Sequence, residues 1–215
     1  MKLQGLIRAS HFGPTLLVTT ISLLFALHYW PIPQALVIAA GVLSGQLLVG
    51  WSNDLHDFQD DRKHGRIKKP LVAGGITKTF LRKTLFVFLP LSCALILLGP
   101  LGFRGGATYL LGIAFGVLYN FYFKYTIASP LPYAVGFAAL PSCISISRNE
   151  TPPSWMWLGG ALFGMAAHFI NVIKDMEEDR SSGIGGLPQR FGRRGSIAAA
   201  TLLIALGVLA LHSAL

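Results

Sequence analysis

The chain has 215 residues, of which 53% are hydrophobic and 13% are charged. A soluble domain usually carries about 25% charged residues, so this composition argues against a soluble globular protein and favours one that crosses a membrane several times. The formal net charge of +9 would suit a nucleic-acid-binding protein, but the placement of the basic residues favours another explanation.

Seven apolar segments are predicted to cross the bilayer as helices. Most of them approach the ~20 residues that a helix needs to span the hydrocarbon core. In chain order they cover residues 13–30, 34–51, 81–98, 106–123, 131–146, 155–173 and 197–214. The sequence therefore predicts an all-α, polytopic transmembrane helical bundle that forms a single integral membrane domain over residues 1–215.

The basic residues fall almost entirely on one side of this arrangement. Lys2 and Arg8 precede the first span, and the loop after the second span is rich in lysine and arginine. Of the 18 Lys and Arg residues, only Arg104 and Arg148 fall on the other side. Cytoplasmic loops of membrane proteins carry such an excess, so we predict that the N-terminus and the acidic segments at residues 53–62 and 171–180 are cytoplasmic. Topology thus explains much of the charge without a nucleic-acid partner, and the rest is available to an anionic substrate.

A polar pattern occurs twice, at the ends of the second and sixth spans. The first copy is NDLHDFQDDR at residues 53–62, and the second is NVIKDMEEDR at residues 171–180. The offset between them is 118 residues, and it also relates Gly65 to Gly183 and Pro70 to Pro188. An even number of spans separates the two copies, which preserves their orientation. We therefore predict a parallel internal repeat with four spans in the first half and three in the second.

Each copy predicts a stripe of polar side chains on one face of a helix, because residues four apart lie nearly above one another. The two stripes are Asn53, Asp57 and Asp61, flanked by Asp54, and Asn171, Asp175 and Asp179. Carboxylates are costly near a bilayer, and two facing acidic stripes would repel each other without a counter-ion. Mg²⁺ prefers oxygen ligands, so the repetition predicts a shared divalent-cation site rather than two solvated helix ends.

Basic residues follow the first copy directly. Arg66, Lys68 and Lys69 precede a flexible glycine-containing segment, which suits a loop that closes over a phosphorylated ligand. On charge alone the same loop is explained by membrane topology. Lys124 follows an aromatic run and either reaches the cavity or extends to the membrane surface. His168 is predicted to be a hydrogen-bonded packing residue outside the site.

The two copies resemble the motifs of the UbiA superfamily of intramembrane prenyltransferases. Asn53-Asp54-x-x-Asp57-x-x-x-Asp61 is similar to the NDxxDxxxD signature of that family, and Asp175-x-x-x-Asp179 is similar to its second motif, DxxxD. The resemblance runs from the first helix to about residue 192. It implies a helical bundle around a central cavity that opens laterally to lipid, in which Mg²⁺ bridges the two motifs to the diphosphate of an isoprenoid donor.

The resemblance also implies roles for individual residues. The metal-site residues would be Asn53, Asp57, Asp175 and Asp179, supported by Asp54, Asp61 and Asn171, with Asp57 and Asp175 essential for catalysis. The residues in contact with diphosphate would be Arg66, Lys69 and Lys124. The chain departs from the family in four respects: it has seven spans rather than nine, Tyr119 lies five residues before Lys124 where the family has a Tyr-x3-Lys motif, position 69 is lysine where arginine is common, and position 172 is valine where an acidic residue is frequent.

Three functions remain open from the sequence. Transfer of the isoprenyl group to an aromatic or other lipophilic acceptor would make the protein a prenyltransferase embedded in the lipid bilayer. Capture of the allylic cation by the substrate's own double bonds would make it a membrane terpene cyclase. A transporter, channel or scaffold would have less reason to keep two complete acidic motifs. Aromatic residues such as Phe115, Tyr119 and Phe123 would either shield the cation or belong to the ordinary core.

Overall fold

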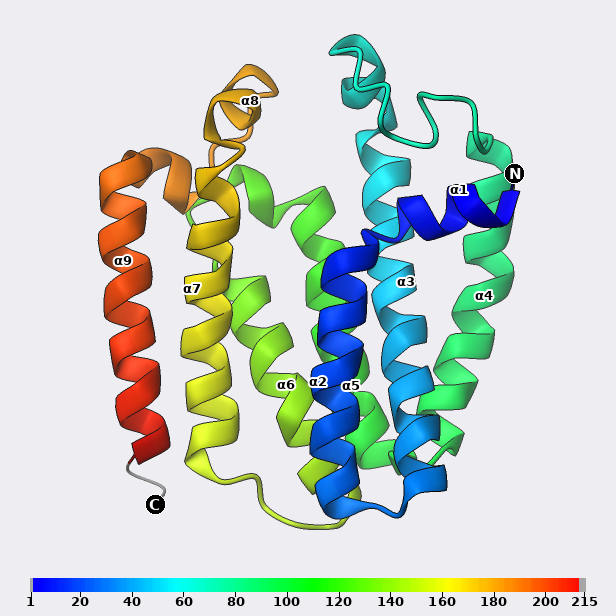
Figure 1. Cartoon of the computed structure of the whole chain (residues 1–215), viewed down its shortest axis with the longest axis vertical. Coiled ribbons are helices and arrows are strands. Elements are labelled where there is room, and N and C mark those ends of the chain that lie inside the picture. The colour runs from blue at the N-terminus through cyan, green and yellow to red at the C-terminus, as the bar shows by residue number, and fades with distance from the viewer. Residues whose placement is uncertain (1, 213–215) are drawn as a thin grey trace. The chain divides into compact units, whose positions relative to one another are not determined.

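The structure is a computed structural model that describes residues 2–212. These residues form helices and connecting loops, without a strand, so the predicted all-α fold is confirmed (Figure 1). The elements are α1 (Lys2–Ala9), α2 (Phe12–Tyr29), α3 (Ile32–Lys63), α4 (Lys78–Leu98), α5 (Gly102–Phe121), the 3₁₀ turn η1 (Phe123–Tyr125), α6 (Leu131–Ser147), the π-helical turn η2 (Trp155–Gly159), α7 (Gly160–Ile173), α8 (Met176–Ser181) and α9 (Leu187–His212).

Each of the seven predicted spans coincides with a helix, although residues 213 and 214 of the last one lie outside the described part of the chain. Five helical segments within residues 2–212 are long and apolar enough to cross a membrane: α2, α3, α4, the η2–α7 segment and α9. Helix α6 has 17 residues and is shorter than these, and α5 is not among the five. The predicted number of seven spans is therefore not confirmed.

The chain divides into two compact units, Met1–Gly106 and Ala107–Leu215. The division falls within α5, and each unit holds one of the two acidic motifs. The assignment of residues 1–215 to a single domain stays a prediction.

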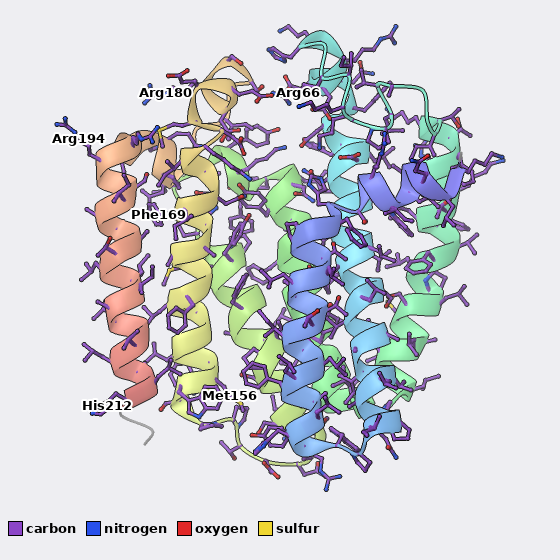
Figure 2. All side chains as sticks on the ribbon, in the orientation of Figure 1. Arg66, Met156, Phe169, Arg180, Arg194 and His212 are labelled. Atoms are coloured by element: carbon purple, nitrogen blue, oxygen red, sulfur yellow. The ribbon has the colours of Figure 1, made fainter. Side chains whose placement is uncertain are left out.

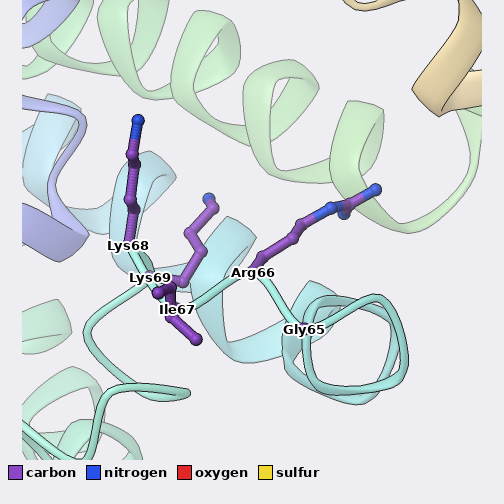
Figure 3. A pocket seen from close by; sticks show the side chains of 5 residues that line it. All are labelled: Gly65, Arg66, Ile67, Lys68 and Lys69. Atoms are coloured by element: carbon purple, nitrogen blue, oxygen red, sulfur yellow. The ribbon is translucent and has the colours of Figure 1, made fainter.

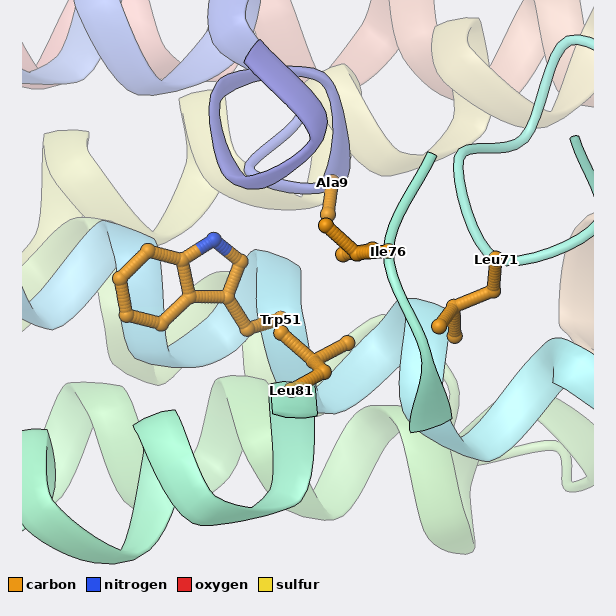
Figure 4. Packing of buried hydrophobic residues seen from close by; sticks show 5 residues of the cluster. All are labelled: Ala9, Trp51, Leu71, Ile76 and Leu81. Carbon is orange, nitrogen blue, oxygen red and sulfur yellow. The ribbon is translucent and has the colours of Figure 1, made fainter. Parts of the chain in front are cut away.

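In the first unit α3 packs against α2 and α4, and α1 lies crosswise to α2 (Figure 1). A buried apolar cluster ties these elements to the loop after α3; Figure 4 shows its members Ala9, Trp51, Leu71, Ile76 and Leu81. The indole Nε1 of Trp51 donates a hydrogen bond to the carbonyl of Leu6, at 2.9 Å. The cluster thus fixes α1 and the loop close to the polar end of α3.

In the second unit α7 packs against both α6 and α9. Glycine permits the close approach of α6 and α7, because a Cβ atom on Gly160 or Gly164 would collide with the carbonyl oxygen of Phe137 or Tyr133. Helix α9 is kinked at Gly192, which has a φ of 67°. The packed core holds the end of α7, and with it the second motif, beside the start of α9.

Candidate functional site

The first acidic motif lies on a single helix, as its spacing predicts. Asn53, Asp57 and Asp61 all belong to α3 and are separated by four residues each. The side-chain Nδ2 of Asn53 donates to Asp57 Oδ2 at 2.9 Å, and both side chains are partly exposed. This pair leaves carboxylate and amide oxygens at the surface of the unit, which is the ligand chemistry that Mg²⁺ requires.

Two carboxylates of the same motif are buried and paired with cations from the following loop. Asp54 and Asp61 are each 2% exposed. Lys69 Nζ donates to Asp54 Oδ1 at 2.7 Å, and Arg66 Nη1 donates to Asp61 Oδ1 at 2.8 Å. A buried charge is tolerated only when it is paired, so these two contacts stabilise the motif as well as the loop.

The loop itself borders an open pocket of about 380 Å³, shown in Figure 3. The residues that line it are Gly65, Arg66, Ile67, Lys68 and Lys69. Gly65 adopts a φ of 63°, which favours glycine, and the Arg66 N–H then donates to the Asp61 carbonyl at 2.9 Å. Three cationic side chains thus line the pocket, and two of them, Arg66 and Lys69, are also paired with carboxylates of the motif.

One neighbour of Asp54 could not be found from the sequence. His11 Nε2 lies 3.3 Å from Asp54 Oδ1 and 3.5 Å from Lys69 Nζ. The contact depends on the turn between α1 and α2, where His11 has a left-handed backbone with a φ of 52°. No local sequence pattern predicts a left-handed backbone conformation at a histidine. The second oxygen of Asp54, Oδ2, is buried and has no hydrogen-bond partner within residues 2–212, which fits a motif that receives a cation.

The second acidic motif does not form the uninterrupted helical stripe that its spacing predicts. Asn171 lies in α7, whereas Asp175 precedes α8 and Asp179 lies inside it. The Asp175 N–H bonds to the carbonyl of Val172, three residues back rather than four, and the helix breaks there. The physical reason is the charge of α8: its first turn holds only acidic residues after Met176, which favours a helix N-terminus at this point.

Asp179 is held by a residue that the sequence analysis missed. Gln189 Nε2 donates to Asp179 Oδ2 at 2.8 Å. Burial raises the pKa of Asp179 above its ordinary value, while the hydrogen bond from Gln189 and the positive charge of Lys124 lower it. Lys124 lies in η1 and is 5% exposed. Because its charge acts on Asp179, this residue, which the sequence analysis predicts to contact diphosphate, lies near the second motif. A comparison of the two sequence copies does not find Gln189, because the matching residue of the first copy is the apolar Leu71.

Aromatic and hydroxyl groups surround the end of α7, where Figure 2 marks Phe169. Asn171 forms a side-chain hydrogen bond with Tyr133. His168 is buried, and its Nε2 lies 3.0 Å from Ser129 Oγ. The Tyr119 and Tyr133 rings pack against the imidazole with centroids at 5.5 and 4.6 Å. The structure thus gives His168 the hydrogen-bonded packing role expected of it.

Neither motif provides a complete metal site by itself. Within residues 2–212 no group of three or more His, Cys, Asp or Glu side chains is placed to hold an ion. Mg²⁺ usually combines one or two carboxylates with water molecules and phosphate oxygens, so a motif that supplies only part of the coordination sphere still fits this cation.

Solved structures share this fold. A UbiA homologue from Archaeoglobus fulgidus bound to DMAPP and Mg²⁺ matches with a TM-score of 0.78 at 19% identity, over 95% of this chain and 75% of that one. A digeranylgeranylglyceryl phosphate synthase matches with a TM-score of 0.75 at 20% identity, over 97% and 76%. The apo form of a UbiA homologue from Aeropyrum pernix K1 gives 0.72 at 18% identity, over 98% and 78%.

No curated protein matches the chain in sequence. The sequence model of the UbiA prenyltransferase family, in contrast, matches residues 15–215. The match covers both acidic motifs, the cationic loop and the helices that carry them. With these features in place, and with several helices long and apolar enough to cross a membrane, the chain belongs to the UbiA prenyltransferase family.

Proposed function

We propose that this protein is a Mg²⁺-dependent intramembrane prenyltransferase, which moves an isoprenyl group from an allylic diphosphate to an aromatic or other lipophilic acceptor. The observation that carries the proposal is the pair of acidic motifs, each with a basic residue beside it: Lys69 next to Asp54 and Lys124 near Asp179. The Archaeoglobus homologue with the same fold is bound to an isoprenyl diphosphate and Mg²⁺, which supports this choice of substrate and cation.

We assign different roles to the exposed and the buried residues of the two motifs. Asn53, Asp57, Asn171, Asp175 and Asp179 would hold Mg²⁺, because their oxygens are at least partly exposed. Asp54 and Asp61 would support the site indirectly, because their hydrogen bonds hold Lys69 and Arg66 in position. An ammonium group has three donors, and Lys69 uses one of them on Asp54, so donors remain for a phosphate oxygen.

The reaction would begin with cleavage of the bond between the allylic carbon and the diphosphate oxygen. Bound Mg²⁺ would supply positive charge at the leaving group. Arg66, Lys69 and Lys124 would hold the same oxygens by charge-assisted hydrogen bonds, which strengthen as negative charge develops there. The acceptor would then attack the allylic cation and lose a proton. We further propose that both motifs and the N-terminus face the cytoplasm, as the distribution of lysine and arginine predicts.

The test is pyrophosphate release by the purified, detergent-solubilised chain from geranyl, farnesyl or geranylgeranyl diphosphate, in Mg²⁺ or EDTA. Release that requires an added aromatic acceptor would support the transferase, whereas Mg²⁺-dependent release with a cyclic product and no acceptor would identify a cyclase instead. Asp57→Ala and Asp175→Ala should each abolish turnover and leave the protein folded. Glu177→Ala removes an exposed carboxylate close to the second motif and serves as the matched control. Full activity in both aspartate variants would contradict the proposal.

A further inference from the structure

Gln189 presents an unusual combination of burial and incomplete hydrogen bonding. It lies in the first turn of α9 and is 7% exposed. Its Nε2 donates to Asp179 Oδ2 at 2.8 Å, whereas its Oε1 is buried and has no hydrogen-bond partner in the described part of the chain. An unpaired buried polar atom is unfavourable, and an apolar side chain of the same length would avoid that cost. The contact that the amide makes and an apolar side chain could not make is the hydrogen bond to Asp179.

The orientation of the amide follows from its chemistry. Reversal of the group would place Oε1, an acceptor, against the Asp179 carboxylate, which is also an acceptor when ionised. The hydrogen bond would then be replaced by repulsion. The nitrogen must therefore face Asp179 as long as that carboxylate is ionised.

The backbone around Gln189 leaves room for this orientation. A Cβ atom on Gly186 would lie 2.9 Å from Gln189 Oε1 and 2.7 Å from Ser129 Oγ, so a larger residue there would displace one of these two side chains. Ser129 Oγ accepts a hydrogen bond from the Leu187 N–H at 3.0 Å and also contacts His168. The start of α9 is thus hydrogen-bonded to the turn before α6, which in turn contacts α7 through His168, and this fixes Gln189 beside Asp179.

The carboxylate at the matching position of the first motif has a different hydrogen-bond partner. Asp61 precedes Asp179 by the repeat offset, and its partner is the cation Arg66 rather than an amide. The residue that matches Gln189 is Leu71, which packs in the apolar cluster of the first unit. A guanidinium neutralises the carboxylate that it contacts, whereas an amide orients the carboxylate and leaves its charge available. Contact with an amide therefore reduces the attraction for a divalent cation less than contact with a guanidinium does.

We infer that Gln189 is a positioning residue, which orients the Asp179 carboxylate for a divalent cation without neutralising it. The inference rests on the proposed function, because it needs the second motif to bind metal. Groups that hydrogen-bond to metal-ligating carboxylates commonly change metal affinity by about 10–100-fold when they are removed.

The test is Mn²⁺ binding to the detergent-solubilised full chain, followed by the electron paramagnetic resonance signal of free Mn²⁺. Gln189→Met keeps the length of the side chain and removes the amide, and we expect it to weaken Mn²⁺ binding about tenfold. Gln189→Asn keeps the amide but withdraws it by one methylene group, and should weaken binding as well. Gln59→Met makes the same chemical change at an exposed glutamine of α3 and should leave the affinity unchanged. Thermal unfolding in EDTA reports the stability of each variant separately.

The outcomes distinguish a failure of the proposed function from a failure of the role assigned to Gln189. Absence of Mn²⁺ binding by the unmodified protein, both alone and with pyrophosphate present, would overturn the proposed metal-dependent function itself. Binding by the unmodified protein with equal affinity in the folded Gln189→Met variant would overturn only the role of Gln189. A variant that loses thermal stability but keeps its Mn²⁺ affinity, or failure of both Gln189 variants to fold, would assign this residue to folding and overturn the inference as well.

Discussion

Replacement of Lys69 by methionine removes one cation from the first motif and keeps the length of the side chain. Lys69 contacts Asp54 at 2.7 Å, and the two side chains are 27% and 2% exposed. Loss of one partner from a buried ion pair leaves an uncompensated charge, which costs about 3–5 kcal/mol. Because Lys69 is partly exposed and His11 remains 3.3 Å from Asp54, we expect the low end, about 3 kcal/mol. In a chain of this size that corresponds to a fall in melting temperature of about 6–12 °C.

The assay is thermal unfolding in detergent followed by circular dichroism, with EDTA and without substrate, so that ligand binding does not contribute. Lys68→Met is the matched control, because Lys68 is exposed and the structure records no ion pair for it within residues 2–212. The double variant Asp54→Asn with Lys69→Met removes both charges and should recover most of the lost stability. A melting temperature for Lys69→Met within about 2 °C of the unmodified protein would refute the assignment of a buried ion pair.

Three further predictions concern packing, hydrogen bonding and the cation. Gly50→Ala would place a Cβ atom 2.7 Å from the Ser10 carbonyl oxygen, so it should cost about 1–3 kcal/mol, measured as a lower melting temperature; an unchanged value would contradict this contact. Ser44→Ala removes a 2.6 Å hydrogen bond between α3 and α4 to Ser92 and should cost about 0.6–1 kcal/mol, with no further loss when Ser92 is also replaced by alanine. EDTA should stop pyrophosphate release and added Mg²⁺ should restore it, whereas an undiminished rate in EDTA would exclude a role for the cation.

Local composition was sufficient to predict the helices but not to predict how many of them span the membrane. Every predicted span is a helix, because an apolar run of this length has few alternatives in a membrane. The spacing of Asn53, Asp57 and Asp61 predicts their common face correctly, since α3 continues to Lys63. The same spacing fails in the second copy, where the acidic first turn of α8 begins a new helix after Asp175.

The candidate site was predictable to the extent that it repeats within the sequence. Both acidic motifs follow from the offset between the two copies, because duplication preserves residue types at matched positions. The contacts of His11 and Gln189 do not repeat, and they depend on a left-handed turn and on the return of α9 towards α8. Such contacts are set by tertiary packing, which a single sequence does not display.

The polar contacts of the first motif have a consequence for biosynthesis, because the paired residues are close together in the sequence. Arg66 follows Asp61 by five residues, and Lys69 follows Asp54 by 15. A loop of ten residues closes in about 10–100 ns, whereas a ribosome adds only about 5–20 residues each second. Loop closure over these separations is therefore fast enough for the ion pairs to form before the second half of the chain is synthesised. Once formed, each pair carries no net charge, which lowers the electrostatic cost of placing the carboxylates of α3 near the membrane.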